Sequence, residues 1–118
     1  MGSNSDLKPR ILHVIARMNV GGTARYLDVL VRGIEGSVLA TGYVQGDEIE
    51  DDCVKNLPII RIPHMGRKIS IFNDIRAFLE LKRIVNDVKP DILHTHTFKA
   101  GLIGRLISGN HKRIHTFR

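Results

Sequence analysis

Short apolar runs alternate in this sequence with longer segments in which apolar residues recur at helical spacing. A near-continuous apolar run at 11–16 predicts a strand buried on both faces, and residues 27–34 then show the spacing of one helix face. Two further runs, at 38–44 and 57–63, predict strands. Strands that alternate with helices in this way predict an α/β fold, with a parallel sheet covered by helices on both faces.

The longest helix is predicted at 70–88, because apolar residues recur there every three or four positions. Charges of alternating sign at the same spacing are typical of an ion-paired surface, so we interpret this helix as scaffold. Its predicted core residues are Ile71, Ile75, Phe78, Leu79, Val85 and Val88, and its predicted solvent-facing charges are Arg76, Glu80, Arg83 and Asp87.

The stretch from Pro90 to Arg105 reads as a strand, a polar turn and a helix. Pro90 ends the preceding helix, and a short apolar strand then carries His94 and His96 on one side. Thr97 is placed to cap the next helix, which brings Lys99 near the carboxyl end of the strand. Ligands bind at that edge of open α/β sheets, so this is the first place to look for chemistry. Within the helix, Gly101 and Gly104 share a face, which predicts close packing there against the sheet or a ligand.

A glycine turn follows the first strand. Gly21 and Gly22 let the backbone approach a ligand closely, and the helix N-terminus after them favours an anion. Thr23 is the predicted N-cap, and Gly33 or Gly36 the predicted end of that helix. Two adjacent glycines are a weak signal, and a tight turn without ligand explains them equally well.

The charge of the chain is uneven. The net charge is +6, yet thirteen Lys and Arg stand against four Asp and Glu from Cys53 onward. A basic half favours anionic partners such as nucleotide phosphates or a membrane surface, although a solvated surface explains most of these charges as well. Nucleic acid is not expected, because aromatic residues are few and no recognition motif is present. The single cysteine excludes an internal disulfide.

The length predicts one domain, at 10–118, after a polar lead-in at 1–9 that resembles an expression tag. No apolar run reaches the roughly 18 residues of a spanning helix. The final strand pattern, at 113–118, breaks off in mid-pattern, so we expect a truncated domain.

Histidines raise the question of a metal. His94 and His96 could present two imidazoles side by side, but no third ligand stands at a convincing spacing, so no metal is expected. His13 lies inside a predicted buried strand and is interpreted as a hydrogen-bonded core residue, and a structural role is favoured for His94 too. No nucleophile, base and acid can be assembled, so the catalytic residues stay unassigned.

The sequence resembles the N-terminal part of family-4 glycosyltransferases, which have two Rossmann-like domains, retain configuration and need no metal. The resemblance covers nearly everything from Arg10 to Arg118. It is carried by the first strand with its Gly-Gly-Thr-Ala-Arg turn, by the block "His-x-His-x-x-Lys-Ala-Gly-x-x-Gly-Arg" that begins at His94, and by the last residues, His115-Thr116-Phe117-Arg118.

This resemblance implies a Rossmann-like N-terminal domain that binds the acceptor, while an absent C-terminal domain holds the nucleotide-sugar. Gly21, Gly22 and Thr23 would face the phosphates of the donor, as would Arg118, which stands where the family often has a histidine. His96, Thr97 and Lys99 would line the acceptor side of the cleft.

The full enzyme would transfer a sugar from a nucleotide-sugar, without a further cofactor, to a lipid-linked or polysaccharide acceptor in bacterial surface-glycan synthesis. It would act in the cytoplasm, with peripheral contact at the inner face of the membrane, and this fragment would not turn over alone. Two alternatives remain open at this point: a sugar-nucleotide epimerase of the same architecture, and a non-catalytic α/β binding module.

Overall fold

The computed structural model describes residues 9–65, 71–96, 98–107 and 111–116. They form a five-stranded parallel sheet with strand order β3-β2-β1-β4-β5. The α/β fold predicted from the sequence is therefore confirmed. The predicted lead-in lies outside the described residues except for Pro9. The strands are β1 (Ile11–Ile15), β2 (Ser37–Thr41), β3 (Ile59–Arg61), β4 (Ile92–His96) and β5 (Lys112–Thr116), and the helices are α2 (Gly22–Gly33), the 3-10 helix η1 (Asp52–Asn56), α3 (Ile71–Val88) and α4 (Phe98–Arg105).

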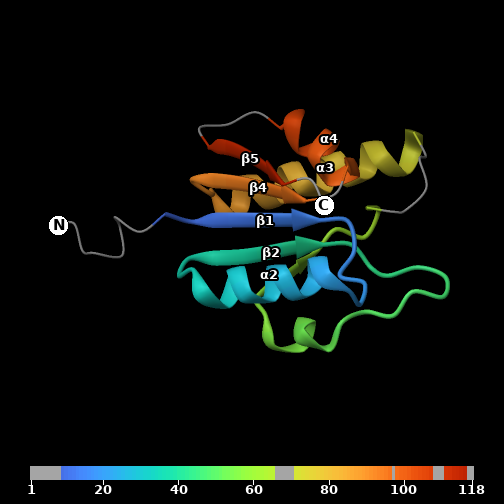
Figure 1. Ribbon diagram of the computed structural model, residues 1–118. Coiled ribbons are helices and arrows are strands. Elements are labelled where there is room, and N and C mark those ends of the chain that lie inside the picture. The colour runs from blue at the N-terminus through green and yellow to red at the C-terminus, as the bar shows by residue number, and fades with distance from the viewer. Residues whose placement is uncertain (1–8, 66–70, 97, 108–110, 117–118) are drawn as a thin grey trace.

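Helices cover both faces of the sheet, as the alternation predicts. Figure 1 shows α2 on one side, and α3 and α4 on the other. Strand β1 is buried along its whole length, so its residues divide between two cores. Leu12 and Val14 pack with α3 and α4, whereas Ile15 packs with α2. A strand buried on both faces explains why the first apolar run is nearly continuous.

Strand ends differ modestly from the prediction. Strand β2 ends at Thr41, and Gly42 follows in a tight space where a Cβ would meet the carbonyl oxygen of Ala16 at 2.6 Å. Strand β3, at one edge of the sheet beside β2, is three residues long. Helix α2 ends at Gly33, one of the two predicted positions, and Gly36 turns the chain into β2 with a φ of +87°.

Helix α3 has the predicted bounds to within one residue, but its predicted core is only partly right. Val85 is buried and Phe78 and Val88 pack against the core, as predicted. Ile71, Ile75 and Leu79 are exposed at 74%, 52% and 55%. The buried residues are Ala77, Leu81, Ile84 and Val85, spaced as one helix face. The sequence of α3 contains two overlapping stripes of apolar residues. Which stripe is buried depends on where the sheet lies against the helix.

The predicted ion-paired surface of α3 is also different. Glu80 does not pair within the helix; its Oε1 accepts a hydrogen bond of 2.9 Å from the His64 backbone N–H, and its Oε2 contacts His64 Nδ1. Glu80 therefore attaches the segment after β3 to α3.

Candidate functional site

The strand order places one reversal in the sheet, between β1 and β4. The chain proceeds outward from β1 to β2 and β3, and then returns to β4 on the other side of β1. In open α/β sheets, ligands bind outside the carboxyl ends of the strands at such a point. Two predicted features meet there: the glycine turn that follows β1, and His96, the last residue of β4.

The glycine turn begins helix α2. Gly21 has φ 154° and ψ −173°, a conformation that favours glycine, and its carbonyl accepts the first helical hydrogen bond from the Arg25 N–H at 3.2 Å. Gly21 is the N-cap and no side chain caps the helix, so the predicted N-cap role of Thr23 is wrong. Thr23 lies inside the first turn because the helix already starts at Gly22. The first turn holds no acidic residue, which leaves its amides suited to an anion.

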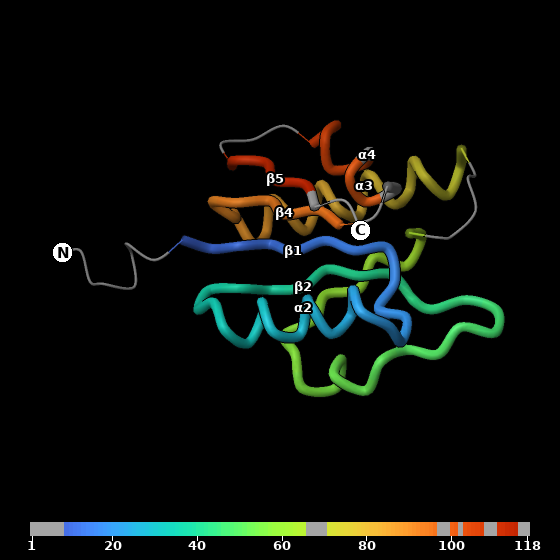
Figure 2. The backbone as a smooth tube through the Cα atoms, viewed as in Figure 1, coloured from blue at the N-terminus to red at the C-terminus, as the bar shows by residue number. Residues whose placement is uncertain are grey.

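A loop from the neighbouring strand holds this turn in place. Residues 48–51 run antiparallel to 18–20: the Val20 N–H donates to the Ile49 carbonyl, and the Asp51 N–H to the Met18 carbonyl, each at 2.8 Å. This acidic loop carries Asp47, Glu48, Glu50, Asp51 and Asp52. In Figure 2 it extends beyond the carboxyl end of β2 and returns toward η1.

Two ion pairs fix the loop. Arg17, which follows β1, lies 3.0 Å from Glu48. Arg61, at the end of β3, contacts both oxygens of Glu50, at 2.6 and 3.0 Å, and donates to the Gly42 carbonyl at 2.9 Å. The Arg61 guanidinium also lies 4.5 Å from the centre of the Tyr43 ring. These carboxylates are therefore engaged in holding the loop.

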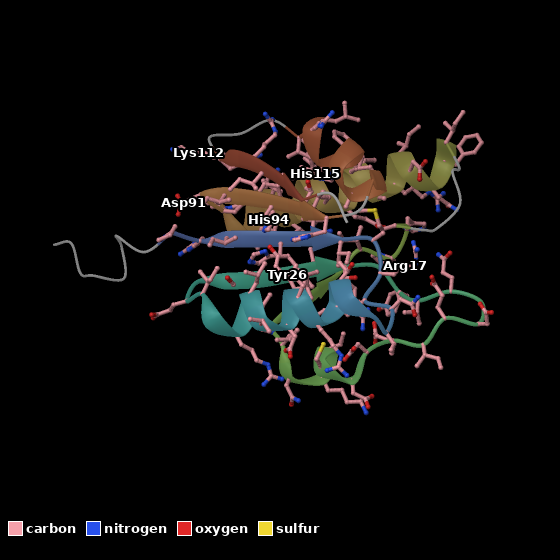
Figure 3. The ribbon with its side chains drawn as sticks, in the orientation of Figure 1. Arg17, Tyr26, Asp91, His94, Lys112 and His115 are labelled. Atoms are coloured by element: carbon pink, nitrogen blue, oxygen red, sulfur yellow. The ribbon has the colours of Figure 1, made fainter. Side chains whose placement is uncertain are left out.

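Three histidines gather beneath the site. Strands β1 and β4 both begin with Ile-Leu-His and pair in register, so His13 lies beside His94. Their Nδ1 atoms are 3.1 Å apart, and the rings of His94 and His96 are 4.0 Å apart between centroids. Tyr26, in the second turn of α2, contacts His96 edge-on, with 5.9 Å between the ring centroids. Figure 3 labels Tyr26 and His94. Tyr26 thereby links the helix after the glycine turn to the end of β4.

Burial controls the charge of this cluster. His13 and His96 are fully buried and His94 is half-buried. Burial, and secondly the neighbouring His94, lowers the pKa of His13 to about 4. Burial, and secondly His115, also lowers the pKa of His94. Both imidazoles are therefore neutral near pH 7. His13 is a hydrogen-bonded core residue, as predicted, because its Nε2 lies 3.2 Å from Ser37 Oγ.

The predicted site residues are only partly placed. Gly21, Gly22 and Thr23 lie at the β1–α2 turn, and His96 lies below it in the interior. Lys99 is the second residue of α4, which begins at the carboxyl end of β4. The structure describes the backbone of Lys99 but not its side chain. Thr97 and Arg118 lie outside the described residues. His13 was predicted as a core residue, but its position beside His94 was not predicted. The Ile-Leu-His tripeptide that β1 and β4 share is the sequence signal that could have revealed it.

Among the described residues, no helix combines the length and the apolar character needed to cross a bilayer.

Known proteins resemble this chain in sequence and in fold. Over 45 residues the chain is 36% identical to a UDP-Gal:alpha-D-GlcNAc-diphosphoundecaprenol alpha-1,3-galactosyltransferase of Escherichia coli, a match that covers 38% of this chain and 12% of that enzyme. The structure of this chain resembles that of MurG of Acinetobacter baumannii (TM-score 0.63, 17% identity) and that of sucrose-phosphate synthase of Thermosynechococcus elongatus (TM-score 0.60, 16% identity).

Both structural matches cover 92% of this chain, which spans 35% of MurG and 33% of the synthase. The family model described as "Glycosyl transferase 4-like" matches residues 38–118. The chain belongs to the glycosyl transferase 4-like family, and its sheet has the Rossmann-like fold of an N-terminal domain of B-type glycosyltransferases.

Proposed function

We propose that this chain is the acceptor-binding part of a retaining, metal-independent glycosyltransferase that moves a sugar from a nucleotide-sugar to a lipid-linked acceptor. Gly21, Gly22 and Thr23, with Arg118, would contact the donor phosphates. His96, Thr97 and Lys99 would form the acceptor side. The second domain of the full enzyme would hold the nucleotide.

The observation that carries this proposal is the glycine turn at the strand-order reversal. A Cβ at Gly22 would meet no atom within 4 Å, so packing inside the described chain gives no reason for a glycine there. Close approach of a ligand does give one. The backbone N–H groups in the first turn of α2 would stabilise the negative charge that develops on the donor phosphates as the leaving group departs. In other enzymes a bound metal ion stabilises this charge.

The epimerase alternative receives less support. Epimerisation needs acid–base groups that are free to act on the sugar. The carboxylates that approach the glycine turn, Glu48 and Glu50, are held by Arg17 and Arg61. The imidazole of His96 is buried and would form the floor of the cleft.

A lipid-linked acceptor is supported by the name of the E. coli relative, which acts on a diphosphoundecaprenol-linked sugar. It is also supported by the exposed stripe on α3, formed by Ile71, Phe72, Ile75 and Leu79. The exposed charged residues at 71–83 are all cations (Arg76, Lys82 and Arg83), whereas the acids Asp74 and Glu80 are half-buried. An apolar stripe with flanking cations fits the inner surface of an anionic membrane.

The position of this stripe agrees with that role. Helix α3 crosses from β3 to β4 in a parallel sheet, so its N-terminal end lies at the carboxyl ends of the strands, on the same side as the arrowheads in Figure 1. A lipid surface in contact with the stripe would lie at the edge that holds the site.

The test of transfer uses the full-length protein, a panel of nucleotide-sugars that includes UDP-galactose, and a diphosphoundecaprenol-linked acceptor, with and without chelator. Transfer that retains configuration and survives chelation is expected. Gly22→Ala should lower kcat/KM by about tenfold or more, a loss of about 1.4 kcal/mol. Gly33→Ala, at the other end of α2 and equally free of neighbours, is the matched control. An epimerised donor, or tight binding of another ligand without transfer, would reject the proposal.

The test of membrane contact is co-sedimentation with vesicles. Binding to vesicles of anionic phosphatidylglycerol, and little binding to neutral phosphatidylcholine, is expected. Phe72→Glu should abolish this binding, whereas Val29→Glu, at another exposed apolar position, on α2, should not. Equal loss in both variants, or no preference for anionic vesicles, would contradict membrane docking through α3.

A further inference from the structure

We propose that His13, His94 and His96 form a binding site for a divalent transition-metal ion, with Zn²⁺ as the best match. One ring nitrogen from each histidine lies within 4.8 Å of the other two. His13 comes from β1 and the other two from β4, and the three side chains share one face of the sheet because the strands pair in register. Sequence spacing offered only two of these ligands. The third, 81 residues from its partner, is supplied by the strand order.

The spacing of the first two nitrogens suits a metal. In a tetrahedral zinc site with Zn–N distances of about 2.0–2.1 Å, two ligand nitrogens are separated by about 3.3 Å. His13 Nδ1 and His94 Nδ1 lie 3.1 Å apart. This pair therefore needs almost no movement to share an ion. All three ligand nitrogens lie within 4.8 Å of one another, so the His96 nitrogen lies at most about 1.5 Å beyond tetrahedral spacing.

The surroundings favour the ligand form of His13. Its Nε2 lies 3.2 Å from Ser37 Oγ, in a buried position. The tautomer whose Nε2–H donates to this hydroxyl leaves the lone pair of Nδ1 directed at His94. Metal-bound histidines regularly have such a partner on the second nitrogen, because it fixes the tautomer and the orientation of the ring. Without metal, the Nδ1–H of His94 would donate to His13; metal binding through that nitrogen would require His94 to shift to its Nε2–H tautomer, which frees the Nδ1 lone pair for the ion.

Imidazole ligands select among the metals. Three neutral nitrogens suit Zn²⁺, Cu²⁺ or Ni²⁺ rather than Mg²⁺ or Ca²⁺, which take oxygen ligands. Three ligands also leave one tetrahedral position for water. The ion would join β1 to β4 where the strand order reverses and would fix His96 below the cleft. The ion would have a structural role and no part in the transfer step, although His96 belongs to both proposals. Metal binding and sugar transfer are measured separately, so each can fail without the other.

The experiment is a titration of the full chain, without an affinity tag, with Zn²⁺ by calorimetry and with Co²⁺ by visible absorption. We expect one ion per chain, the absorption bands of tetrahedral Co²⁺, and a rise in Tm with added Zn²⁺. His94→Gln should remove the Co²⁺ bands. Ser37→Ala should weaken Zn²⁺ binding by about 10- to 100-fold. His64→Gln, a histidine outside the cluster that contacts Glu80, should change neither.

Absence of the Co²⁺ bands in the unmodified chain would overturn the proposal, as would equal Zn²⁺ affinity in the His94→Gln and His64→Gln variants. Because His94→Gln could fail to fold, X-ray absorption of the zinc-loaded unmodified chain provides a second measurement. Three imidazole nitrogens at about 2.0–2.1 Å are expected around the ion, and sulfur or carboxylate ligands would contradict the site.

Discussion

The imidazole of His115 lies directly against the backbone of Gly101. A Cβ at position 101 would meet His115 Cε1 at 2.4 Å and Nδ1 at 2.6 Å. On its other side, His115 Nδ1 is 2.7 Å from Thr95 Oγ1. Gly104 allows the next close approach, since a Cβ there would meet Thr95 Cγ2 at 2.8 Å. The two glycines therefore let α4 pack closely on β4 and β5, as their spacing predicted, and the partner is the sheet.

Gly101→Ala should lower the free energy of unfolding. The added methyl group must displace the His115 ring, at a cost of about 1–3 kcal/mol that exceeds the gain of about 1 kcal/mol in helix propensity. His115→Ala should remove most of this cost when the two are combined. Urea unfolding of the single and double variants measures the coupling. Gly33→Ala, with no neighbour to displace, should be neutral or stabilising, and an equal loss there would refute the packing explanation.

Glu50→Gln should loosen the loop that supports the glycine turn. The substitution weakens the paired contacts with Arg61, for a loss of about 1 kcal/mol at this half-buried position. Amide exchange at Val20 and Asp51, whose hydrogen bonds join the loop to the turn, should accelerate. Asp52→Asn is the control, because the Asp52 side chain is 94% exposed and lies 3.8 Å from Lys55. Unchanged exchange in Glu50→Gln would show that the ion pair does not hold the loop.

Cys53 should resist alkylation. Burial raises the pKa of its thiol to about 12, with a further contribution from Asp51. The reactive thiolate is therefore scarce at pH 8, and iodoacetamide should react at least about a hundredfold more slowly than with free cysteine. Unfolding in urea should restore the alkylation rate of free cysteine. Asp51→Asn should accelerate alkylation of the folded chain. If Cys53 of the folded chain reacts as fast as free cysteine, the raised pKa of its thiol is wrong.

His111 should make the fold sensitive to mild acid. Burial, and secondly Arg113, lowers the pKa of His111, and within the described residues its buried Nε2 has no hydrogen-bond partner. As the pH falls through the unfolded value near 6.5, the unfolded chain takes up a proton that the folded chain does not, so stability decreases.

The test compares His111→Asn with the unmodified chain at pH 7.5 and 5.5. One such proton contributes a slope of at most about 1.4 kcal/mol per pH unit, and the variant should lose that contribution. His64→Gln serves as the control, because His64 is bound to Glu80 at the surface of α3. Equal pH slopes in His111→Asn and the unmodified chain would show that His111 is not responsible.

Several elements could be predicted because their signals are local. The apolar run of β1, the end of α2 at Gly33 and the length of α3 all follow from neighbouring residues. The start of α2 was placed two residues late, because a threonine is the better capping side chain. Gly21 takes the N-cap position instead, since its φ of 154° suits glycine.

Other features depended on contacts distant in sequence. The core of α3 was predicted correctly at Phe78, Val85 and Val88 but wrongly at Ile71, Ile75 and Leu79, because two apolar stripes compete along the helix and the sheet buries Ala77, Leu81 and Ile84 instead. The acidic loop showed no periodicity, so its hydrogen bonds to residues 18–20 could not be anticipated.

Periodicity and turn residues in the sequence determined the type of fold, the glycine turn and the membership in a family, because each of these is written in contiguous stretches of chain. Tertiary structure alone decided that β4 returns beside β1. That strand order brought His13 to 3.1 Å from His94, and it placed the glycine turn above His96. Which strands become neighbours depends on how the helices cover both faces of the sheet, and no pattern within a short stretch of sequence predicts that arrangement.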